Sequence, residues 1–566
     1  MKQKKKVSFV AVFGCGISGL AAAHELAEKG LNVRVYEKLL EPGGVARSYR
    51  PDSESVPSEY SWRGYGPFYF NAFDLMKRIP TMDGKTVYDN LSRPIHFIFT
   101  KNKGSFEGEL SWKDKVALGI IVSKVAAAGV KRTAHYASIN AADYMKPRMS
   151  DRGWKQFIHM FGPWVGIDPQ RASLFHVIFF IVVHYFPNSQ PPYWHHDKDG
   201  KWKVDTLDWS VFNKPTSDAW FDPWVKHLEN MGVKFYFGHG LYSIQLDRNS
   251  NRISSVVVST GTGNQSIVKA DNYVMAISPF GMRDVLKESI SSIKRPHSLI
   301  KMADQFSNLT QDGPHIQVSF RIGFDTQFSW ADKQEPVILS DSEFNITMYS
   351  QDDLWDNNVY LGPGIKSLWS GTACVSYVPG SLFGKAVVDL TKDQFKQEIL
   401  CQLSKDVGFN DMLREKMGKS FSRLLPNMIH FDIWKNWRFT DGIGKPKPIS
   451  IIEPKYVDST NTRPHQPHTA TPISNMWMAG GHTRTSTDIW SMEAAAEAGR
   501  RAADMITGGN STIVQDKGVV LKSLGIVDDM LYTMGMPNVV DVVLLLIIIL
   551  IIILIIYVLR RRKNKK

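Results

Sequence analysis

Cysteine is scarce in this sequence, with only Cys15, Cys374 and Cys401 among 566 residues. Three cysteines at such spacings provide neither a disulfide framework nor a CxxC metal motif. His176 and His184 stand eight residues apart, but the sequence around them supplies no further metal ligands. We therefore expect no structural disulfide and no metal centre.

A cleavable secretion signal is also missing. The basic N-terminus leads directly into a strand-like run and a glycine turn, without the apolar core and small-residue cleavage site of a signal peptide. Internal repeats and low-complexity tracts are absent as well. The length and an apolar content of 43% predict a globular chain of several domains or one large two-domain enzyme.

Positive charge is concentrated at the two ends of the chain. The net charge is +13; four of these charges come from Lys2, Lys4, Lys5 and Lys6, and six come from residues 560–566. The body between the ends is nearly balanced, which argues against a basic nucleic-acid-binding face. Basic ends on a balanced body suit an anionic membrane surface. We expect a lipid bilayer as a partner, and no nucleic acid.

Long apolar runs are missing except near the C-terminus. Val542–Leu559 is eighteen residues of Val, Leu and Ile with a single Tyr. As a helix it would be roughly 27 Å long, close to the hydrocarbon thickness of a bilayer. A soluble helix would keep a polar stripe, so the run predicts a transmembrane helix. Its position predicts a single-pass, tail-anchored membrane protein with a cytosolic body and a basic tip at 560–566.

A weaker apolar pattern precedes this run. Val520, Leu524, Val527 and Leu531 recur at helical spacing, which is typical of an amphipathic helix. We expect residues 511–541 to form a linker with an amphipathic segment near the membrane. Within the body, Leu174–His184 is strongly apolar but too short to span a bilayer. It predicts a buried helix, with a hydrophobic substrate wall or a membrane-dipping helix as alternatives.

Glycine marks the most informative stretch, which lies near the N-terminus. Val7–Phe13 has strand propensity, the sequence GCGISG follows at 14–19, and residues 20–27 predict a helix. Leu31–Tyr36 predicts a second strand, which ends at Glu37. Strand, GxGxxG, helix, strand and acid in this order form a βαβ unit that binds dinucleotides. A βα turn that binds nothing is the alternative.

Each residue of the turn has an expected role. Gly14 permits the tight turn, Gly16 lets the backbone approach a pyrophosphate, and Gly19 lets the helix pack on the strand. The helix N-terminus at Ser18 supplies free N–H groups and partial positive charge for the phosphates. Glu37 would accept hydrogen bonds from ribose hydroxyls.

A second glycine pair, Gly43-Gly44, follows the second strand, and Arg47 comes soon after it. Bare backbone at the pair would allow close approach to a flat ring system, with Arg47 facing a phosphate or the ring. A surface turn is the alternative.

Further signatures lie later in the chain. Residues 270–279 predict a strand that returns to the sheet, Asn475–His482 predicts a strand that enters Gly480-Gly481, and Ser491–Ala503 predicts a strong helix. Together with the N-terminal βαβ unit, these motifs resemble the flavin amine oxidase and phytoene (carotenoid) desaturase superfamily. They cover its FAD-binding portions from end to end.

The resemblance implies an α/β fold with FAD as the cofactor. A discontinuous Rossmann-type FAD-binding domain would comprise 1–75, 223–290 and 470–510, and an α+β substrate domain would comprise 76–222 and 291–469. The linker 511–541, the transmembrane helix 542–559 and the basic tip would complete the chain.

The resemblance also assigns residues around the flavin. The last helix would aim its N-terminus, at Met492, toward the ring and stabilise negative charge on the reduced flavin. The remaining cofactor-binding candidates are Gly43, Gly44, Arg47, Gly480 and Gly481. The candidates for lining the flavin face are Gln317, His482 and Trp490.

Two residues depart from the amine oxidase pattern. Gln317 stands where a strand lysine near the flavin is usual, and Ser491 stands where a tyrosine is usual. The segment Ser491-Met492-Glu493 resembles the plant-type carotenoid and phytoene desaturases more closely. Gly481 departs from the desaturase pattern as well, because it replaces the acid that usually follows Ala-Gly and reaches the FAD linkage.

We therefore expect a membrane-anchored, FAD-dependent oxidoreductase. It would transfer hydride from a substrate C–H bond to the flavin, as a desaturase does, on a small apolar or lipid-like molecule. O₂, a quinone or another electron acceptor would reoxidise the flavin. A flavin amine oxidase with an altered pocket and a flavin-binding scaffold without turnover are the alternatives.

Overall fold

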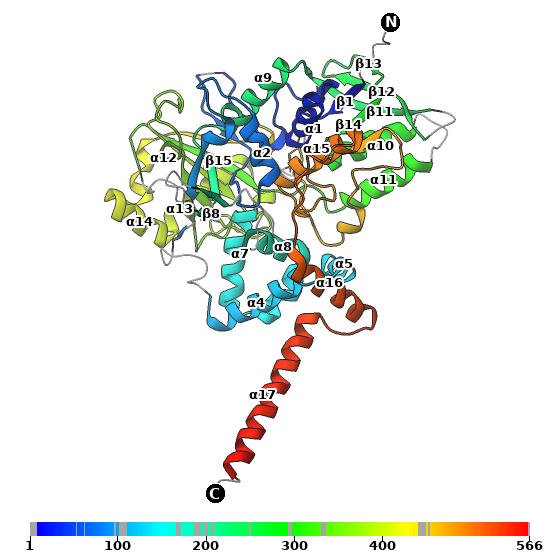
Figure 1. Cartoon of the computed structure of the whole chain (residues 1–566). Coiled ribbons are helices and arrows are strands. Elements are labelled where there is room, and N and C mark those ends of the chain that lie inside the picture. Colours follow the sequence, from blue (N-terminus) through cyan, green and yellow to red (C-terminus); the bar gives the residue numbers. More distant parts are fainter. Residues whose placement is uncertain are drawn as a thin grey trace.

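The computed structural model describes residues 8–563, except 53, 62, 96–97, 101–109, 166–170, 186–193, 197–201, 205–208, 248–250, 292–296, 330–335, 440–448 and 451–452. Val7, the N-terminal lysines and residues 564–566 of the basic tip lie outside the described residues. A body of sheets and helices carries one long helix, α17 (Val539–Lys563), which projects away from it (Figure 1).

The centre of the fold is a five-stranded parallel sheet built from three distant parts of the chain. Its strand order is β10-β2-β1-β14-β22. The strands are β1 (Phe9–Phe13), β2 (Asn32–Glu37), β10 (Lys234–Phe237), β14 (Asn272–Met275) and β22 (Met476–Met478). Residues 10–13 of β1 are fully buried, as expected for a parallel strand that is covered on both faces. The predicted α/β, discontinuous Rossmann-type domain is confirmed.

Two helices, α1 (Ile17–Glu28) and α15 (Met492–Thr507), pack against each other beside this sheet. Glycine permits their close approach, because a Cβ at Gly499 would lie 2.2 Å from the carbonyl oxygen of Ser18. The Ser18 hydroxyl donates a 2.8 Å hydrogen bond to the carbonyl oxygen of Ala495. The first and last parts of the domain are thereby held together.

Two antiparallel sheets complete the body. One contains β11 (His239–Leu246), β12 (Ile253–Thr260) and β13 (Gln265–Val268), and it packs on α10 (Pro279–Ser291). The other has the order β19-β15-β18-β17-β16-β6 and lies in the predicted substrate domain. Its strands are β6 (Ile98–Phe99), β15 (Val318–Phe324), β16 (Val337–Ile338), β17 (Thr347–Ser350), β18 (Ser367–Ala373) and β19 (Met428–Ile433).

The apolar stretch predicted as a buried helix is α8 (Leu174–Tyr185). Side chains from Leu174 to Val183 are at most 5% exposed. The helix packs on α4 (Trp112–Ala126) and α5 (Val130–Ala137) inside the body. Burial by protein removes the membrane-dipping alternative.

The predicted linker 511–541 is instead a folded part of the body. The backbone N–H of Ile513 donates to the side-chain oxygen of Asn71 at 2.9 Å, and the Gln515 amide donates to the carbonyl oxygen of Phe68 at 3.0 Å. The following helix, α16 (Gly518–Thr533), packs on α5. The two hydrogen bonds join residues that are 442 and 447 positions apart along the chain, so no local sequence pattern indicates them.

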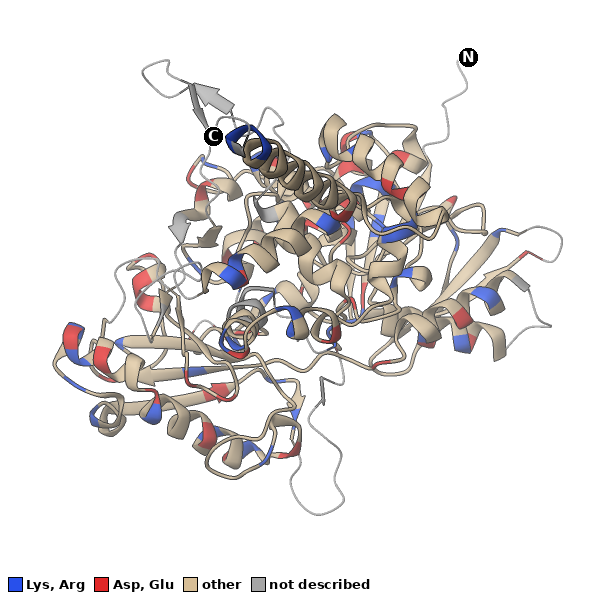
Figure 2. Ribbon diagram, turned by 90° about the horizontal axis from the view of Figure 1, so that it is seen from below, with Lys and Arg blue, Asp and Glu red and all other residues tan. Residues whose placement is uncertain are grey.

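Within the described chain, α17 is the one helix long and apolar enough to cross a membrane. Its most apolar window has a mean hydropathy of 3.9, and none of that window is buried in the body. The helix extends beyond the predicted 542–559 in both directions. Seen from below, its shaft is free of charged residues and its far end is basic (Figure 2).

Candidate functional site

A cavity of about 660 Å³ opens at the carboxyl ends of the parallel strands, where α/β sheets bind their ligands. The Rossmann domain forms one side, and one end of the six-stranded sheet forms the other. Most residues predicted for the site line this cavity: Gly14, Gly16, Ser18, Glu37, Gly43, Gly44, Gln317, Gly480, Gly481, His482, Trp490 and Met492. Segments far apart in the sequence are thus brought together.

The first glycine turn combines a crowded position with a left-handed backbone at Gly14 and an uncrowded position at Gly16. Gly14 has a φ of +101°, and a Cβ there would lie 2.4 Å from the carbonyl oxygen of Ala276. A Cβ at Gly16 would meet only the Cα of Gly44, at 4.0 Å. Gly14 therefore serves the turn, while Gly16 and Gly44 leave bare backbone facing the cavity, as close approach to a pyrophosphate requires.

Gly19 does not line the cavity. A Cβ at Gly19 would lie 1.9 Å from the carbonyl oxygen of Gly14, so only glycine lets α1 pack this closely on the turn. This placement agrees with the packing role expected for Gly19. Gly16 and Ser18, in contrast, present the N-terminus of α1 and its unpaired N–H groups to the cavity.

Glu37 ends β2 and is fixed by two backbone donors. Its carboxylate accepts hydrogen bonds from the N–H of Cys15 at 2.7 Å and of Leu39 at 2.9 Å. Burial raises the pKa of Glu37, and these N–H donors oppose the rise. The carboxylate thus joins β2 to the glycine turn and still lines the cavity.

Arg47 does not line the cavity and is not part of a surface turn. It is 1% exposed, and its guanidinium forms ion pairs with Glu453 and with Glu41, the latter at 2.7 Å. It also donates to the carbonyl oxygen of Gly44 at 2.8 Å. The expectation that Arg47 faces a phosphate or the flavin is therefore wrong in this arrangement, because two carboxylates hold it behind the glycine pair.

The N-terminus of α15 is directed at the cavity. Ser491 caps it by accepting a 3.1 Å hydrogen bond from the N–H of Ala494, and Met492 follows at the cavity wall. Next to it, His482 is 2% exposed, and burial lowers its pKa to about 3, so its ring is neutral at pH 7. The backbone N–H of Trp490 donates to Asp458 at 2.7 Å, which fixes the loop before the helix.

A lysine that the sequence analysis missed lies at the substrate-domain end of the cavity. The ammonium of Lys455 donates a 2.6 Å hydrogen bond to the side-chain oxygen of Gln317, and it lies 5.2 Å from the ring centre of Trp490. Burial lowers the pKa of Lys455 from 10.5 to about 8. Gln317 in turn donates to the sulfur of Cys374 at 3.4 Å. The sequence position of Gln317 suggests that this end of the cavity has no amine. The structure places the Lys455 amine there.

The cavity wall includes a buried cation and several aromatic rings. Lys455 forms no ion pair with any described residue, and Arg63, also in the lining, pairs with Glu59 at 3.1 Å. The lining carboxylate Glu453 is already neutralised by Arg47. The aromatic residues of the lining are Tyr60, Tyr69, Phe180, Trp209, Tyr242, Phe280, Tyr456 and Trp490. Phe180 comes from α8, so the buried helix also supplies a wall of the cavity.

No group of three or more candidate metal ligands occurs among the described residues. His176 lies in α8, where its Nδ1 contacts the hydroxyl of Ser173 at 2.7 Å, and the side chain of His184 is outside the described part. The three cysteines are all free thiols.

Family patterns identify this arrangement. The pattern of an NAD(P)-binding Rossmann-like domain matches residues 12–79. The pattern of the flavin containing amine oxidoreductases matches residues 221–507, just over half of the chain. The chain belongs to this family. As a flavin-containing amine oxidoreductase, it is an FAD-dependent oxidoreductase, and the expected family and cofactor are confirmed.

Individual relatives fall on both branches of the superfamily. Zeta-carotene desaturase of Synechocystis sp. is 22% identical over 545 residues, which cover 89% of this chain and 98% of that protein. The chloroplastic/chromoplastic zeta-carotene desaturase of Arabidopsis thaliana is 20% identical over 548 residues, covering 89% and 86%. Cyclohexylamine oxidase from Brevibacterium oxydans shares the fold, with a TM-score of 0.56 at 14% identity over 89% of this chain and 99% of that chain.

The residues of this flavin-containing amine oxidoreductase fit FAD. Bare backbone at Gly16 and Gly44 and the N-terminus of α1 suit the pyrophosphate, and Glu37 suits a ribose. The N-terminus of α15 at Met492 suits a ring that becomes negatively charged on reduction. FAD, when bound, supplies the hydride-accepting chemistry.

Proposed function

We propose that this protein is a membrane-bound, desaturase-like oxidoreductase that acts on an apolar or lipid-like molecule. The observation that carries the proposal is Lys455 in the cavity wall. Below its pKa of about 8 this side chain is a cation, and Glu453, the lining carboxylate closest to it along the chain, is already paired with Arg47. The other lining carboxylates, Glu37, Asp284 and Glu288, come from β2 and α10 of the Rossmann side. A cationic amine would be repelled in this poorly solvated space, whereas a neutral apolar molecule would not.

The aromatic wall supports the same substrate class. Tyr60, Tyr69, Phe180 and Trp209 present aromatic rings to the cavity, and pockets lined by such rings bind apolar molecules. The similarity to zeta-carotene desaturases, whose names state a polyene substrate, is a further support.

A desaturation removes two hydrogens from adjacent carbons. One would leave as hydride, which FAD is able to accept when bound, and the other would leave as a proton, with a C=C bond formed between the two carbons. The neutral form of Lys455 is a suitable acceptor for that proton, because its lowered pKa makes this form accessible near pH 8. The side-chain oxygen of Gln317, at 2.6 Å, positions the amine. O₂, a quinone or another acceptor would take up the electrons from reduced FAD.

We further propose that α17 anchors the protein in a membrane as a single span, with the body on the cytosolic side. The length of α17, the mean hydropathy of 3.9 of its most apolar window and the absence of burial along that window support this role, because so apolar a helix is not stable in water. The basic residues after Leu559 would lie at the opposite interface.

An amine oxidase with an altered pocket is the second candidate function, and the position of Lys455 supports it as well. A buried lysine in the cavity wall, next to Gln317, would take the place of the strand lysine for which Gln317 stands, but it comes from another segment of the chain.

The test is anaerobic mixing of the FAD-loaded full-length protein in detergent with candidate substrates. Bleaching of the visible flavin absorbance by a polyene or another lipophilic compound, but not by primary amines, is the expected result. Rapid bleaching by amines alone would establish the second candidate instead. If neither class bleaches a flavin that dithionite reduces normally, the protein is a flavin-binding scaffold.

A further inference from the structure

Helix α16 has an apolar stripe that no described residue covers. Val519, Ile526, Met530 and Met534 recur at helical spacing, and they are 80%, 61%, 60% and 71% exposed. The opposite side of the helix, at Gly525, packs against the Ala128–Gly129 backbone that precedes α5. One side of α16 thus packs against the body, and the other side exposes large apolar side chains.

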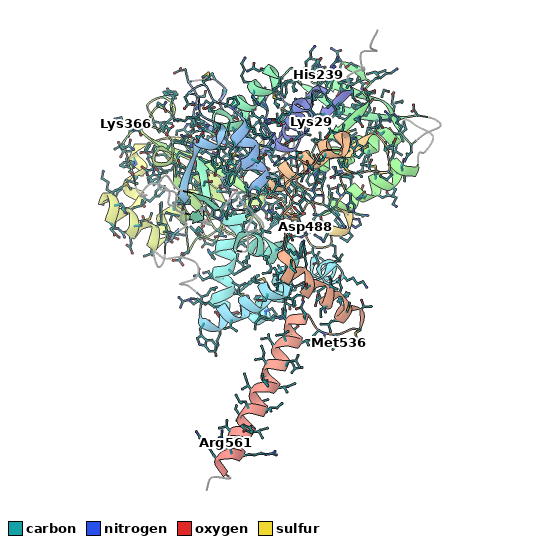
Figure 3. The ribbon with its side chains drawn as sticks, viewed as in Figure 1. Lys29, His239, Lys366, Asp488, Met536 and Arg561 are labelled. Carbon is teal, nitrogen blue, oxygen red and sulfur yellow. The ribbon has the colours of Figure 1, made fainter. Side chains whose placement is uncertain are left out.

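The neighbouring helices extend this apolar surface. Trp112 at the start of α4 is 71% exposed, and Val130 at the start of α5 is 82% exposed. Helices α4, α5 and α16 lie together at the end of the body from which α17 leaves, and Met536 lies beside the start of α17 (Figures 1 and 3). The exposed apolar side chains therefore gather where the most apolar helix begins.

The root of α17 is fixed to these helices. The fully buried carboxylate of Asp528 in α16 accepts hydrogen bonds from Gly129 N–H at 3.3 Å, Arg132 Nε at 3.2 Å and Val539 N–H at 3.0 Å. On the other side of the root, Lys124 of α4 pairs with Asp541 at 2.5 Å. One hydrogen bond, from Val539 N–H to Asp528, and one ion pair, between Lys124 and Asp541, thus connect α16 and α4 to the first turn of α17. The pair between Arg132 and Asp528 joins α5 to the same cluster.

Because the first turn of α17 is fixed to the body, the position of α17 in a membrane determines the position of the body relative to that membrane. If the apolar run from Val542 enters the hydrocarbon, the α16 stripe and Trp112 are held near the headgroup level, because no flexible linker separates them from the span. We propose that this surface, formed by the α16 stripe with Trp112 and Val130, inserts into the headgroup and acyl boundary of the bilayer that α17 spans. This inference rests on the proposed membrane span and adds a second attachment to it.

The chemistry of the surface favours lipid over a protein partner. Lys113, Lys115 and Lys131 are exposed on α4 and α5, and Lys522 on α16 is exposed while it pairs with Asp516 at 2.6 Å. Lysines beside an apolar face pair with anionic headgroups. Trp112 has the amphipathic ring that is enriched at membrane interfaces. The surface is also continuous with α17, whose partner is lipid in the proposed function.

The test places a fluorescent label at single cysteines in the full-length chain. Cys401 is first replaced by serine, since Cys15 and Cys374 are buried. Ile526→Cys and Met534→Cys report on the α16 stripe, and Leu550→Cys reports on the shaft of α17. Ile267→Cys is the matched control, because Ile267 is 64% exposed on β13, far from α17 (Figure 1).

The labelled proteins are reconstituted in vesicles of phosphatidylcholine and phosphatidylserine. Emission is then quenched either by lipids with a nitroxide near the headgroup or by aqueous iodide. We expect the nitroxide to quench labels at 526 and 534 several-fold more than the label at 267, and iodide to show the reverse order. Measuring two stripe positions keeps the result usable if one variant fails to fold.

Three outcomes overturn the proposal, and they differ from one another. If the label at 550 is protected by lipid while those at 526 and 534 are quenched by iodide, the span stands and the docking surface is wrong. If the label at 550 is itself quenched by iodide, α17 does not span, and the proposed anchor fails together with this inference. If the stripe labels are protected from both quenchers and show energy transfer between copies, a second copy of the chain covers the stripe instead.

Discussion

The ammonium nitrogen of Lys455 lies 2.6 Å from the side-chain oxygen of Gln317, inside the cavity and 138 positions away along the chain. Gln317 alone suggests a flavin site without an amine. The pair instead places an amine with a pKa of about 8 at the substrate end of the cavity.

We expect Lys455→Met to remove a pH dependence from flavin reduction. Burial keeps the pKa of Lys455 near 8, so the proton-accepting neutral form grows as pH rises through 8. The wild-type reduction rate should rise across this range, and the variant should be roughly 10²- to 10⁴-fold slower with no inflection there. Anaerobic stopped-flow measurements from pH 6 to 10 report it. The control is Lys366→Met, at an exposed lysine that does not line the cavity and is labelled in Figure 3.

The same substitution should change substrate preference. Without the Lys455 charge, a primary amine meets less repulsion in the cavity, so its apparent binding to the oxidised enzyme should tighten. Binding of a neutral polyene should change much less. Titrations followed by the flavin spectrum at pH 7 measure both. Equal changes for the two ligand classes would show that charge does not set the preference.

Gly16→Val should yield a folded protein without FAD. A Cβ at this position meets nothing closer than 4.0 Å, so the chain itself tolerates it, but the side chain fills the space next to Gly44. Absorbance of the purified protein and thermal unfolding separate the two effects. Gly19→Ala is the contrasting variant, since its Cβ would lie 1.9 Å from the carbonyl oxygen of Gly14, and it should lower the melting temperature. A Gly16→Val protein with normal FAD content would contradict the assignment.

Arg47→Met should destabilise the protein because it leaves Glu453 buried without its ion-pair partner. Breaking a buried pair by removing one member costs about 3–5 kcal/mol. Unfolding of the FAD-loaded protein by urea measures the loss. The double variant with Glu453→Gln should recover a part of it. Unchanged stability with weaker FAD binding would instead return Arg47 to the role of a cofactor ligand.

A chain that ends after Asp541 should lose integral membrane association and keep FAD. All cavity-lining residues precede residue 496, and α15 ends at Thr507. Alkaline extraction of membranes followed by absorbance of the released protein is the measurement. Truncated protein that stays in the washed membrane pellet would locate the anchor elsewhere.

The parts of the fold and of the site that can be predicted from the sequence are those formed by short, continuous stretches of the chain. The turn at Gly14–Gly19, its flanking strands and Glu37 lie within 30 residues, so spacing alone indicates their geometry. The pairs Lys455–Gln317 and Arg47–Glu453 are 138 and 406 positions apart, and only the folded chain brings them together.

The segment 511–541 illustrates the same limit. Its apolar spacing correctly indicates a helix, but the spacing does not reveal that one side packs on α5. In the sequence, Asp528 cannot be told apart from an exposed polar residue. Its carboxylate is buried at the start of α17 because it binds partners as far as 399 positions away. Sequence patterns give the periodicity of a helix, whereas tertiary contacts decide which side is covered.

The contacts of Asp528 and Asp541 at the root of α17 also bear on how the protein responds to its membrane. A span on a loose tether adapts to a thin or thick bilayer by tilting on its own. Here the first turn of α17 is bonded to α4 and α16, so any tilt of the span must turn the whole body with it. Hydrocarbon thickness would then set the angle at which the cavity faces the lipid pool, and lipid composition would act on turnover without any ligand binding to the protein.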